Sequence, residues 1–418
     1  MSGRDAGNTG VCRLCGYGLR YELVDLGLSP LCETLLTEAQ IQQPESFYPL
    51  QVRVCEHCYL VQIDEYVSPE FIFTSDYPYF SSYSDSWLRH AKTYAELAIR
   101  RFQLTSGSQV VEIGSNDGYL LQFFAEQGIP VLGIEPAAGV AQAAIQKQIR
   151  TVISFFGLQT ARELAASGFQ ADLLVGNNVL AQAPQVNDFV AGLKVLLTPR
   201  GVITMEFPHL MRLISETQFD TIYHEHFSYF SCGTAERLFA AHGLTLYDVE
   251  ELPTHGGSLR VFVRHMEDET KPVSDRVGKL RAREQAAGLM SMEYYCGFAE
   301  RVREVKRKLL AFLTDAKQAG KSVVGYGAPG KGNTLLNYCG IRTDLLEYTV
   351  DRNPIKHGKY TPGSHIPIRP VEVVHETKPD YLLILPWNLR HEIERQMDYI
   401  RAWGGRFVIP VPEVHILQ

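Results

Sequence analysis

The chain has 418 residues, a length that predicts about two or three domains because single hydrophobic cores stop growing near ~250 residues. A hydrophobic content of 45% and a charged content of 21% are ordinary for a globular protein. The formal net charge of -7 argues against a nucleic-acid partner, since a dedicated nucleic-acid-binding protein is usually basic. No run approaches the ~20 apolar residues of a membrane span, and the opening "MSGRDAGNTG" lacks the apolar stretch of a signal peptide. We therefore expect a cytoplasmic protein with no membrane partner.

Two CxxC motifs define the first expected unit, residues 11–75. Cys12 and Cys15 stand in "CRLC", and Cys55 and Cys58 follow in "CEHC" after a gap of 39 residues. Each short loop lets two thiolates converge, and two such loops complete a closed tetrahedral zinc site. We predict a structural zinc ion, with a ribbon filling the gap, because a closed four-thiolate site leaves no position for a substrate. The other cysteines are expected to be small core residues: Cys32, Cys232, Cys296 and Cys339.

The second expected unit, residues 80–266, alternates strands and helices. "SDSWLRHAKTYAELAIRRF" (84–102) has its apolar residues on one helical face, and "YLLQFFAEQG" (119–128) predicts a helix after a strand. A buried strand, a glycine loop and further buried strands predict a doubly wound α/β domain with its ligand at the carboxyl ends of the strands. The alternation in "GGSLRVFVRH" predicts an edge strand. The expected strands are "SQVVEIG" (108–114), "VLGIEP" (131–136), "ADLLVGN" (171–177), "GVITMEF" (201–207) and "GGSLRVFVRH" (256–265).

The third expected unit, residues 276–418, begins after the polar, proline-containing stretch 265–275. Residues 276–319 predict a long helical connection, whose basic residues we interpret as a solvated face. "KSVVGYG" (321–327), "LEYTVD", "DYLLILP" and "GRFVIPV" then predict strands. The fold class is therefore α/β, with a zinc-binding module, a central doubly wound domain and a smaller C-terminal α/β domain.

The central glycine loop distinguishes between cofactors. "EIGSNDG" carries Glu112, Gly114 and Gly118 in a spacing that fails the G-x-G-x-x-G pattern of dinucleotide sites. Glu135, 17 residues after Gly118 and at the end of the next strand, is placed to accept hydrogen bonds from ribose hydroxyls. Together they favour S-adenosylmethionine over NAD; a different nucleotide is the alternative. Further candidate cofactor contacts are Asn116, Asn177 and Asn178, for the last two of which ordinary turn chemistry is the alternative.

A second glycine loop, "GYGAPGKG", contains G-x-x-x-x-G-K but continues with Gly332 where a P-loop needs Ser or Thr for magnesium. This departure argues against an NTPase. The loop and its lysine, Lys331, can still hold a substrate diphosphate through backbone N–H groups and one cation. A tight turn that only stabilises the fold is equally compatible with the pattern.

With these motifs in place, the chain resembles the nucleotide-sugar C-methyltransferases, notably the C-3 methyltransferases that build branched deoxysugars of the mycarose and tetronitrose type. The resemblance covers nearly the whole chain and includes the paired CxxC motifs, "DYPYFSSYSDSW", "VVEIGSNDGYLL", "GIEPA", "YHEHFSYFS", "THGGSLRVFV", "GKGNTLLNY" and "VDRNPIKHGKYTPGSHIPI". It implies a class I methyltransferase domain, structural zinc, S-adenosylmethionine, and a nucleotide-diphosphate 4-keto-6-deoxysugar bound between the middle and last domains.

The same resemblance implies the catalytic residues. It assigns the base to His226, the second histidine of Y-H-E-H, and implicates Tyr223, Glu225 and Tyr77. The substrate contacts that we expect are Tyr79, His224, Lys331 and Asn333. One departure is Gln182, which stands in "NNVLAQAP" where we expect many relatives to carry histidine. It bears on the local sugar environment.

The chemistry of carbon methylation is an independent reason to expect a side chain that acts as a general base. Methylation of carbon by a sulfonium requires a carbon nucleophile, and removing the C–H proton beside a ketone gives an enolate. Histidine has a pKa suited to that step, and a tyrosine hydroxyl such as that of Tyr77 or Tyr223 can donate to the oxyanion. Glu225 can orient an imidazole or hold a sugar hydroxyl. For Tyr77 and Tyr79, aromatic packing is the alternative.

The spacing of His224 and His226 leaves other readings open. A metal site is disfavoured because the two lie on one face only in an extended strand and lack the helical H-E-x-x-H spacing. A structural or substrate-binding histidine is the stronger alternative. At the level of function, the rivals are a sugar O-methyltransferase and a non-catalytic, zinc-stapled ligand-binding protein. The motifs specify neither the sugar, the nucleotide base nor the oligomeric state.

Overall fold

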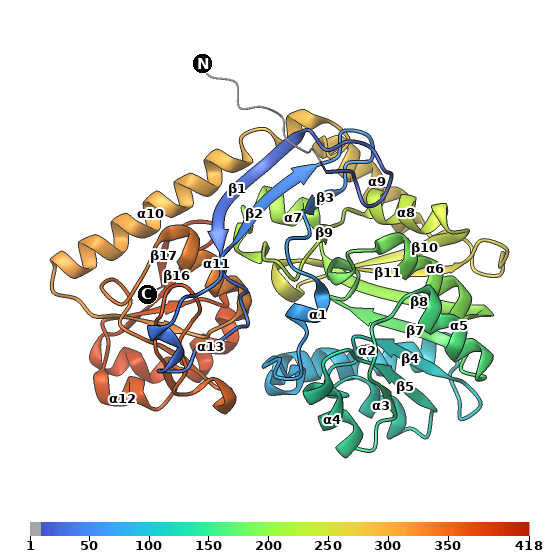
Figure 1. Cartoon of the computed structure of the whole chain (residues 1–418), viewed down its shortest axis with the longest axis horizontal. Coiled ribbons are helices and arrows are strands. Elements are labelled where there is room, and N and C mark those ends of the chain that lie inside the picture. The colour runs from blue at the N-terminus through green and yellow to red at the C-terminus, as the bar shows by residue number, and fades with distance from the viewer. Residues whose placement is uncertain (1–9, 418) are drawn as a thin grey trace.

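The computed structural model describes residues 10–417, which form two α/β lobes joined by an N-terminal ribbon (Figure 1). The ribbon pairs β1 (Tyr21–Ser29) with β2 (Tyr48–Val54) in antiparallel register, as expected for the gap between the CxxC motifs. Next to β2 lies β3 (Val61–Ile63), and a short helix, α1 (Pro69–Ile72), follows it. The fourth strand of this sheet is β9 (Ser228–Tyr229), which comes from the central lobe.

The central lobe contains a seven-stranded sheet in the order β10-β11-β8-β7-β4-β5-β6. The strands β4 to β8 run parallel to one another, and β11 runs antiparallel to both β8 and β10. Because helices cover both faces, strands such as β4 are buried at every residue. The bounds are β4 (Val110–Ile113), β5 (Val131–Ile134), β6 (Thr151–Val152), β7 (Ala171–Asn177), β8 (Leu197–Pro208), β10 (Leu244–Leu252) and β11 (Ser258–His265).

The prediction of an edge strand at residues 256–265 is wrong. The strand β11 lies inside the sheet between β8 and β10, and all of its residues except His265 are buried. The edge is β10, whose sequence "LTLYDVEEL" pairs along the length of β11. The alternation of polar and apolar residues in this segment led to the wrong prediction. Its polar residues Arg260 and Arg264 do not face solvent but are buried and hydrogen-bonded.

The first helix of the central lobe shows how the sequence sets local structure. In α2 (Asp85–Phe102), the Ser84 side chain caps the N-terminus by accepting from the backbone N–H of Trp87. Its apolar face, including Trp87 and Tyr94, is buried. The predicted helix at 119–128 is shorter, because a turn precedes it. The other helices are α3 (Leu121–Ala125), α4 (Ala138–Gln146), α5 (Leu158–Ala166), α6 (Val186–Leu196), α7 (Leu210–Ser215) and α8 (Cys232–Ala241).

The long helical connection is divided into α9 (Asp275–Ala287) and α10 (Phe298–Gln318). Gly288 and Gly297 adopt left-handed backbone conformations at the break, which residues other than glycine rarely adopt. The helix α9 packs against β10 and α8 of the central lobe, whereas α10 packs against β1 and the C-terminal lobe. The ribbon and α10 therefore lie together along one side of the C-terminal lobe (Figure 1).

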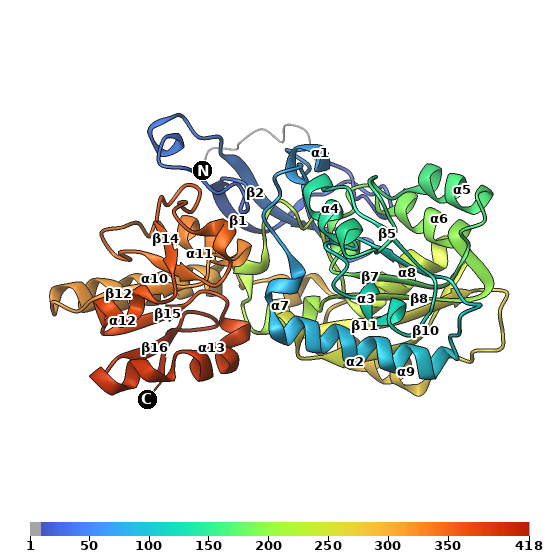
Figure 2. The same ribbon diagram turned by 90° about the horizontal axis from the view of Figure 1, so that it is seen from below.

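The C-terminal lobe has a six-stranded sheet in the order β14-β13-β12-β15-β16-β17, parallel except for β17. The turned view shows the two lobes beside each other with α2 between β11 and the viewer (Figure 2). The strands are β12 (Val323–Tyr326), β13 (Thr349–Asp351), β14 (Ile368–Pro370), β15 (Tyr381–Ile384), β16 (Arg406–Ile409) and β17 (His415–Leu417). The helices are α11 (Gly330–Cys339), α12 (Val373–Thr377) and α13 (Arg390–Gln396).

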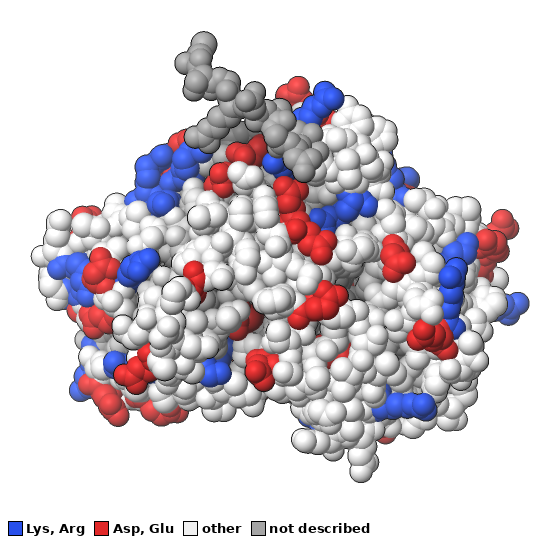
Figure 3. Space-filling model, viewed as in Figure 1, with Lys and Arg blue, Asp and Glu red and all other residues white. Residues whose placement is uncertain are grey.

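Charged residues of both signs are interspersed over the face seen in Figure 3. Most basic residues of α10 are exposed, and two of them pair with acidic neighbours one turn away, Arg303 with Glu300 and Arg307 with Glu304, which fits a solvated face. Lys306 is half-buried and donates to the Tyr338 carbonyl instead. Within residues 10–417, no helix is long and apolar enough to cross a membrane.

Candidate active site

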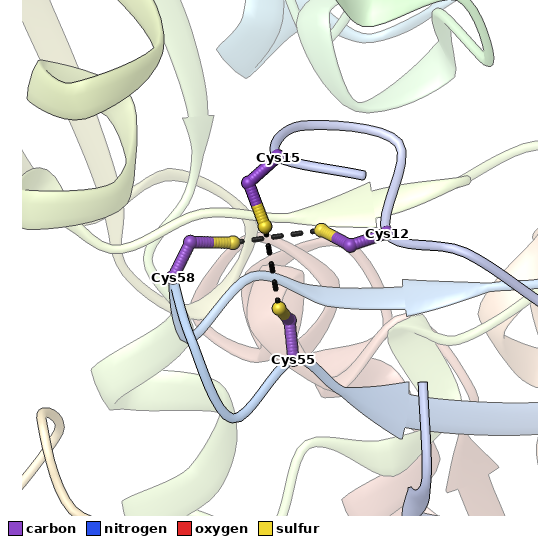
Figure 4. A group of neighbouring side chains, drawn as sticks. All are labelled: Cys12, Cys15, Cys55 and Cys58. Atoms are coloured by element: carbon purple, nitrogen blue, oxygen red, sulfur yellow. Dashed lines mark hydrogen bonds between the residues drawn. The ribbon is translucent and has the colours of Figure 1, made fainter. Parts of the chain in front are cut away.

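The four cysteines of the CxxC motifs converge on one point (Figure 4). Their sulfur atoms all lie within 4.8 Å of one another, with Cys12 Sγ 3.5 Å from Cys58 Sγ and Cys15 Sγ 3.6 Å from Cys55 Sγ. A tetrahedral zinc ion with Zn–S bonds of ~2.3 Å separates its sulfurs by ~3.8 Å, so the cluster fits the ion. Three of the cysteines are buried, and the set leaves no open coordination position. The cluster is a structural zinc site.

The zinc module is fastened to the loop that carries the Y-H-E-H motif. Arg13, inside the first CxxC motif, donates to the backbone carbonyl of Ile63 and, through its backbone N–H, to Gln62 Oε1 at 3.0 Å. Gln62 Nε2 in turn donates to Cys12 Sγ at 3.2 Å. Gln62 also belongs to β3, where it pairs with Ser228 of β9. The metal-binding turns, β3 and the segment after His226 thus form one connected unit.

One cavity of about 880 Å³ extends between the strand ends of the central lobe and the facing edge of the C-terminal lobe. Its walls come from the loop before α2, the strand ends of β4, β5 and β7, the Y-H-E-H turn, and the start of α11. Because the carboxyl ends of parallel strands meet at one edge, the central sheet opens into this cavity as predicted for a doubly wound fold. We call the part lined by the central sheet the donor side, and the part lined by the Y-H-E-H turn and the C-terminal lobe the acceptor side.

On the donor side, Gly114, Asn116 and Glu135 line the cavity. Gly114 has a φ of +67°, and a Cβ there would lie 3.2 Å from the side chain of Val179, so the turn favours glycine. The carboxylate of Glu135 accepts from the backbone N–H of Asn116 at 3.0 Å and of Ala137 at 2.9 Å, which fixes it at the end of β5.

The amide of Asn116 connects the donor side to the loop that precedes α2. Its Oδ1 accepts from the Ser81 N–H at 2.8 Å, and its Nδ2 donates to the Tyr79 carbonyl at 3.1 Å. Asn177 and Asn178 also line the cavity: Asn177 Nδ2 donates to the Tyr119 hydroxyl at 3.0 Å. Asn178 Oδ1 is buried without a hydrogen-bond partner among residues 10–417. The donor side therefore offers fixed carboxylate oxygens and a free amide oxygen, acceptors that fit the hydroxyl and ammonium groups of S-adenosylmethionine.

Two predicted cofactor residues lie behind this wall. Glu112 is fully buried in β4, and Gly118 forms the next turn with a φ of +78°; neither lines the cavity. Both carboxylate oxygens of Glu112 lack a hydrogen bond within the described chain, and burial raises its pKa well above the ordinary value.

On the acceptor side, the Y-H-E-H motif is a turn rather than a strand. The N–H of His226 donates to the Tyr223 carbonyl at 2.9 Å, so the two histidines point to different surroundings. His226 lines the cavity beside Tyr223, with ring centroids 4.2 Å apart. Its Nδ1 lies 3.1 Å from the Thr221 carbonyl, which requires a proton on Nδ1 and leaves the Nε2 lone pair free.

Burial lowers the pKa of His226 to about 4, below the near-neutral value that the base hypothesis assumed. The imidazole is therefore neutral at neutral pH and able to accept a proton. A negative charge developing next to it would stabilise the imidazolium and raise the pKa during a reaction.

Glu225 and Tyr77, two of the predicted catalytic residues, are hydrogen-bonded to each other, and Cys32 joins them. The Tyr77 hydroxyl donates to Glu225 Oε2 at 2.9 Å, and Cys32 Sγ donates to Oε1 at 3.3 Å. Burial, with a smaller contribution from the carboxylate of Glu33, raises the pKa of Glu225 to about 7. Cys32 is buried as expected for a core residue, but its thiol also orients a cavity-lining carboxylate.

Two of the predicted substrate contacts lie outside the cavity. His224 is turned toward the ribbon, where its Nε2 lies 3.1 Å from the Pro49 carbonyl and its ring packs edge-on against Tyr48. Asn333 is buried one turn into α11, where its Oδ1 accepts from Asn337 Nδ2 at 3.2 Å. Tyr79 and Lys331, the other two, line the cavity, and so does Gln182.

Three cationic side chains of the C-terminal lobe reach the acceptor side, and they differ in their partners. Lys356 forms a buried ion pair with Glu33 at 3.4 Å. Arg352 pairs with Asp85 at 3.1 Å across the lobes. Lys331, at the start of α11, donates to Asn388 Oδ1 at 2.8 Å and lies over the Trp387 ring, 4.6 Å from its centroid.

A buried polar cluster beside the cavity was missed from the sequence. Glu206, at the end of β8, accepts from His90 at 2.8 Å, Arg260 at 2.7 Å and Thr254 at 2.8 Å. Burial opposes the charge of Glu206, but these partners outweigh it and lower its pKa to about 2. The sequence did contain a signal for Glu206: it is a carboxylate near the end of the predicted strand "GVITMEF", just as Glu135 stands at the end of its strand.

His255, in a positive-φ turn in the middle of "PTHGG", was also missed. It lines the cavity, and its Nε2 lies 3.0 Å from Asn178 Nδ2. Burial lowers its pKa to about 3, with a further contribution from the charge of Lys331.

Comparison with known proteins gives the family. Three family models cover successive parts of the chain: residues 12–73 match "Putative zinc binding domain", 87–249 match "Methyltransferase domain", and 253–412 match "C-methyltransferase C-terminal domain". The C-methyltransferase NovU from Streptomyces niveus is 35% identical over 410 residues, which are 97% of this chain and 96% of that protein.

Among solved structures, the PH0226 protein from Pyrococcus horikoshii OT3 aligns with 49% of this chain and 99% of its own, at 14% identity and a TM-score of 0.37. The magnesium protoporphyrin IX methyltransferase from Synechocystis PCC 6803 aligns with 42% of this chain and 78% of its own, at 14% identity and a TM-score of 0.33. The full-length match to NovU and the family models that describe a methyltransferase domain and a C-methyltransferase C-terminal domain decide the assignment: the chain belongs to the S-adenosylmethionine-dependent C-methyltransferases and carries a structural zinc site.

Proposed function

We propose that this C-methyltransferase acts on a nucleotide-linked 4-keto-6-deoxysugar, removes the proton at C-3 beside the ketone, and methylates that carbon. The observation that supports the proposal is the single cavity in which the donor side and the acceptor side face each other. A methyl donor on the sheet and a sugar against the C-terminal lobe would meet there at His226. The volume of about 880 Å³ lies in the upper part of the range for small-molecule sites.

The donor side would hold S-adenosylmethionine through Gly114, Asn116, Glu135, Asn177 and Asn178. The cofactor supplies an electrophilic methyl group on a positively charged sulfur. Glu135 is the group for the ribose hydroxyls, because its carboxylate is fixed at the end of β5 by two backbone N–H donors. The chain positions this donor relative to the acceptor carbon, and positioning is a major source of rate.

His226 is the proposed base. With Nδ1–H held by the Thr221 carbonyl, the ring presents Nε2 as acceptor toward the cavity, in the tautomer that proton abstraction needs. The C–H electrons then form the enolate, and the proton resides on Nε2. The Tyr223 ring packs against the imidazole at a tilt of 35° and lines the cavity, so its hydroxyl is available to a sugar oxygen. Tyr77 is committed to Glu225, and that pair is suited to a sugar hydroxyl.

Labelling separates this function from its rivals. The enzyme is incubated in deuterium oxide with the keto-sugar nucleotide and S-adenosylhomocysteine, and deuterium at C-3 is followed by mass spectrometry. A second incubation uses S-adenosylmethionine carrying a ¹³C-methyl group, and NMR locates the label. We expect exchange at C-3 and a new C–C bond. A label on oxygen would identify a sugar O-methyltransferase. Binding without exchange or transfer would support a ligand-binding protein.

A further inference from the structure

Lys331 is a buried cation without an anionic partner. It is 8% exposed, it lines the cavity, and its ammonium group makes one hydrogen bond, to the neutral amide of Asn388. No carboxylate of the described chain lies within ion-pair distance of it. An ammonium has three N–H donors, so two remain for a ligand. A buried charge is costly unless paired, which indicates that a bound anion or developing negative charge completes this site.

The surroundings show where that negative charge would lie. Trp387 separates Lys331 from Asp220: its indole N–H donates to Asp220 Oδ2 at 2.6 Å, and its ring lies under the ammonium. On the cavity side, the charge of Lys331 lowers the pKa of both His226 and His255, so these two imidazoles are within electrostatic reach. The field of the Asp220 carboxylate favours the charge of Lys331, but burial is the larger effect and lowers the pKa of this lysine to about 8.

We infer that the Lys331 ammonium binds the C-4 ketone oxygen of the acceptor sugar and stabilises the enolate oxyanion that forms when His226 removes the C-3 proton. This inference rests on the proposed function. As the C–H bond breaks, its proton moves to His226 Nε2 and its electron pair forms the C-3–C-4 double bond. The carbonyl oxygen gains the negative charge opposite the ammonium. When C-3 takes the methyl group, the oxygen becomes a ketone again.

Ring geometry favours the ketone oxygen over the diphosphate as the partner of Lys331. The diphosphate is attached at C-1, which lies across the sugar ring from C-4, whereas the ketone is adjacent to the carbon that His226 deprotonates. A cation near His226 therefore faces the ketone. Arg352, further along the C-terminal lobe and in contact with Asp85, is the candidate for the diphosphate. This assignment replaces the diphosphate role that the glycine loop predicted for Lys331.

The test compares wild type, Lys331→Met and a matched control, Lys308→Met, whose lysine is exposed on α10 away from the cavity. Deuterium exchange at C-3 is measured in deuterium oxide with saturating keto-sugar nucleotide and S-adenosylhomocysteine. Calorimetry gives the affinity for the nucleoside diphosphate without its sugar. We expect Lys331→Met to slow exchange roughly 100-fold or more, the usual loss of one oxyanion donor. Its affinity for the nucleoside diphosphate should equal that of wild type, and Lys308→Met should match wild type in both measurements.

A second variant distinguishes loss of the ammonium group from misfolding of the protein. Lys331→Ala should regain exchange when ethylammonium is added, because a small cation can occupy the vacated volume. Normal exchange in Lys331→Met, or a nucleoside diphosphate complex that is weakened in this variant, would overturn the inference. Reductive trapping of a covalent adduct on Lys331 by borohydride would also overturn it. If wild type itself shows no exchange, the proposed function fails instead.

Discussion

The two sides of the cavity are built in different ways. The donor side comes from consecutive strand ends: Gly114 and Asn116 follow β4, Glu135 follows β5, and Asn177 ends β7. The acceptor side joins segments that are far apart in the chain, with Tyr77 before α2, His226 after β8 and Lys331 on α11. The acceptor side also depends on the zinc module, through the pairing of β3 with β9. In the proposed function, cofactor binding would thus rest on one domain, whereas substrate chemistry would rest on the assembly of all three segments.

Removal of zinc should have the largest effect of all, and it should affect the acceptor side far more than the donor side. Structural zinc in small domains contributes roughly 10–16 kcal/mol to folding, and here it holds the turns that fasten β3 to β9. We expect Cys55→Ser to raise amide hydrogen exchange in residues 10–63 and 221–229 far more than in residues 110–135. Activity should be lost. Amide hydrogen exchange followed by mass spectrometry measures the protection of each segment, and the zinc content is determined in the same samples.

The matched control is Cys296→Ser, which changes a cysteine outside the metal cluster; the expectation that Cys296 lies in the core is wrong, because it is exposed at the break between α9 and α10. It should keep the zinc and the exchange pattern of wild type. Equal protection of residues 221–229 in zinc-free and zinc-bound protein would show that the acceptor side is independent of the metal.

His226→Asn tests the acceptor side alone. Loss of a general base reduces the rate by roughly 10²–10⁴-fold, so C-3 exchange and methyl transfer should both fall by that factor. Calorimetry should show unchanged affinity for S-adenosylmethionine, because His226 lies on the opposite side of the cavity from Glu135. Near-normal turnover would refute the base assignment.

The reciprocal variant, Glu135→Ala, should change the donor side alone. A hydrogen bond to a charged group contributes roughly 1.5–3 kcal/mol, so the Kd for S-adenosylmethionine should rise about 10- to 150-fold. C-3 exchange without any cofactor should remain at the wild-type rate. A parallel loss of exchange would mean that the two sides are coupled more tightly than their construction suggests.

The smallest effect concerns the pH dependence of stability at Glu225. Its pKa is raised from 4.5 to about 7, chiefly by burial, so the folded state binds this proton more tightly than the unfolded state. The associated stability is present below pH ~4.5 and is lost as the pH rises toward 7. The glutamine in Glu225→Gln does not titrate. We therefore expect the difference in Tm between this variant and wild type to shift in favour of the variant as the pH rises over this interval. A constant difference in Tm would show that Glu225 is ionised throughout.

The sequence by itself determined the elements whose signal is local. The CxxC turns, the buried strands and the capped helix α2 follow from spacing and periodicity. Glu135 was found because a carboxylate at a strand end must lie at the ligand-binding edge of a doubly wound sheet. The Y-H-E-H motif was singled out, but its conformation was not predicted, because two histidines two residues apart occur in a strand and in a turn alike.

Only the tertiary structure decided which of these residues share the cavity. It turned His224 toward the ribbon and His226 into the cavity, because the N–H of His226 closes a turn on Tyr223 and β9 then pairs with β3. It also placed β11 inside the sheet and brought Cys32 to Glu225 across 193 positions of sequence. Such contacts arise from the packing of separate segments, so no local pattern in the chain encodes them. The sequence shows that Lys331 is a cation, but only the folded protein shows that no carboxylate among residues 10–417 lies at ion-pair distance from it.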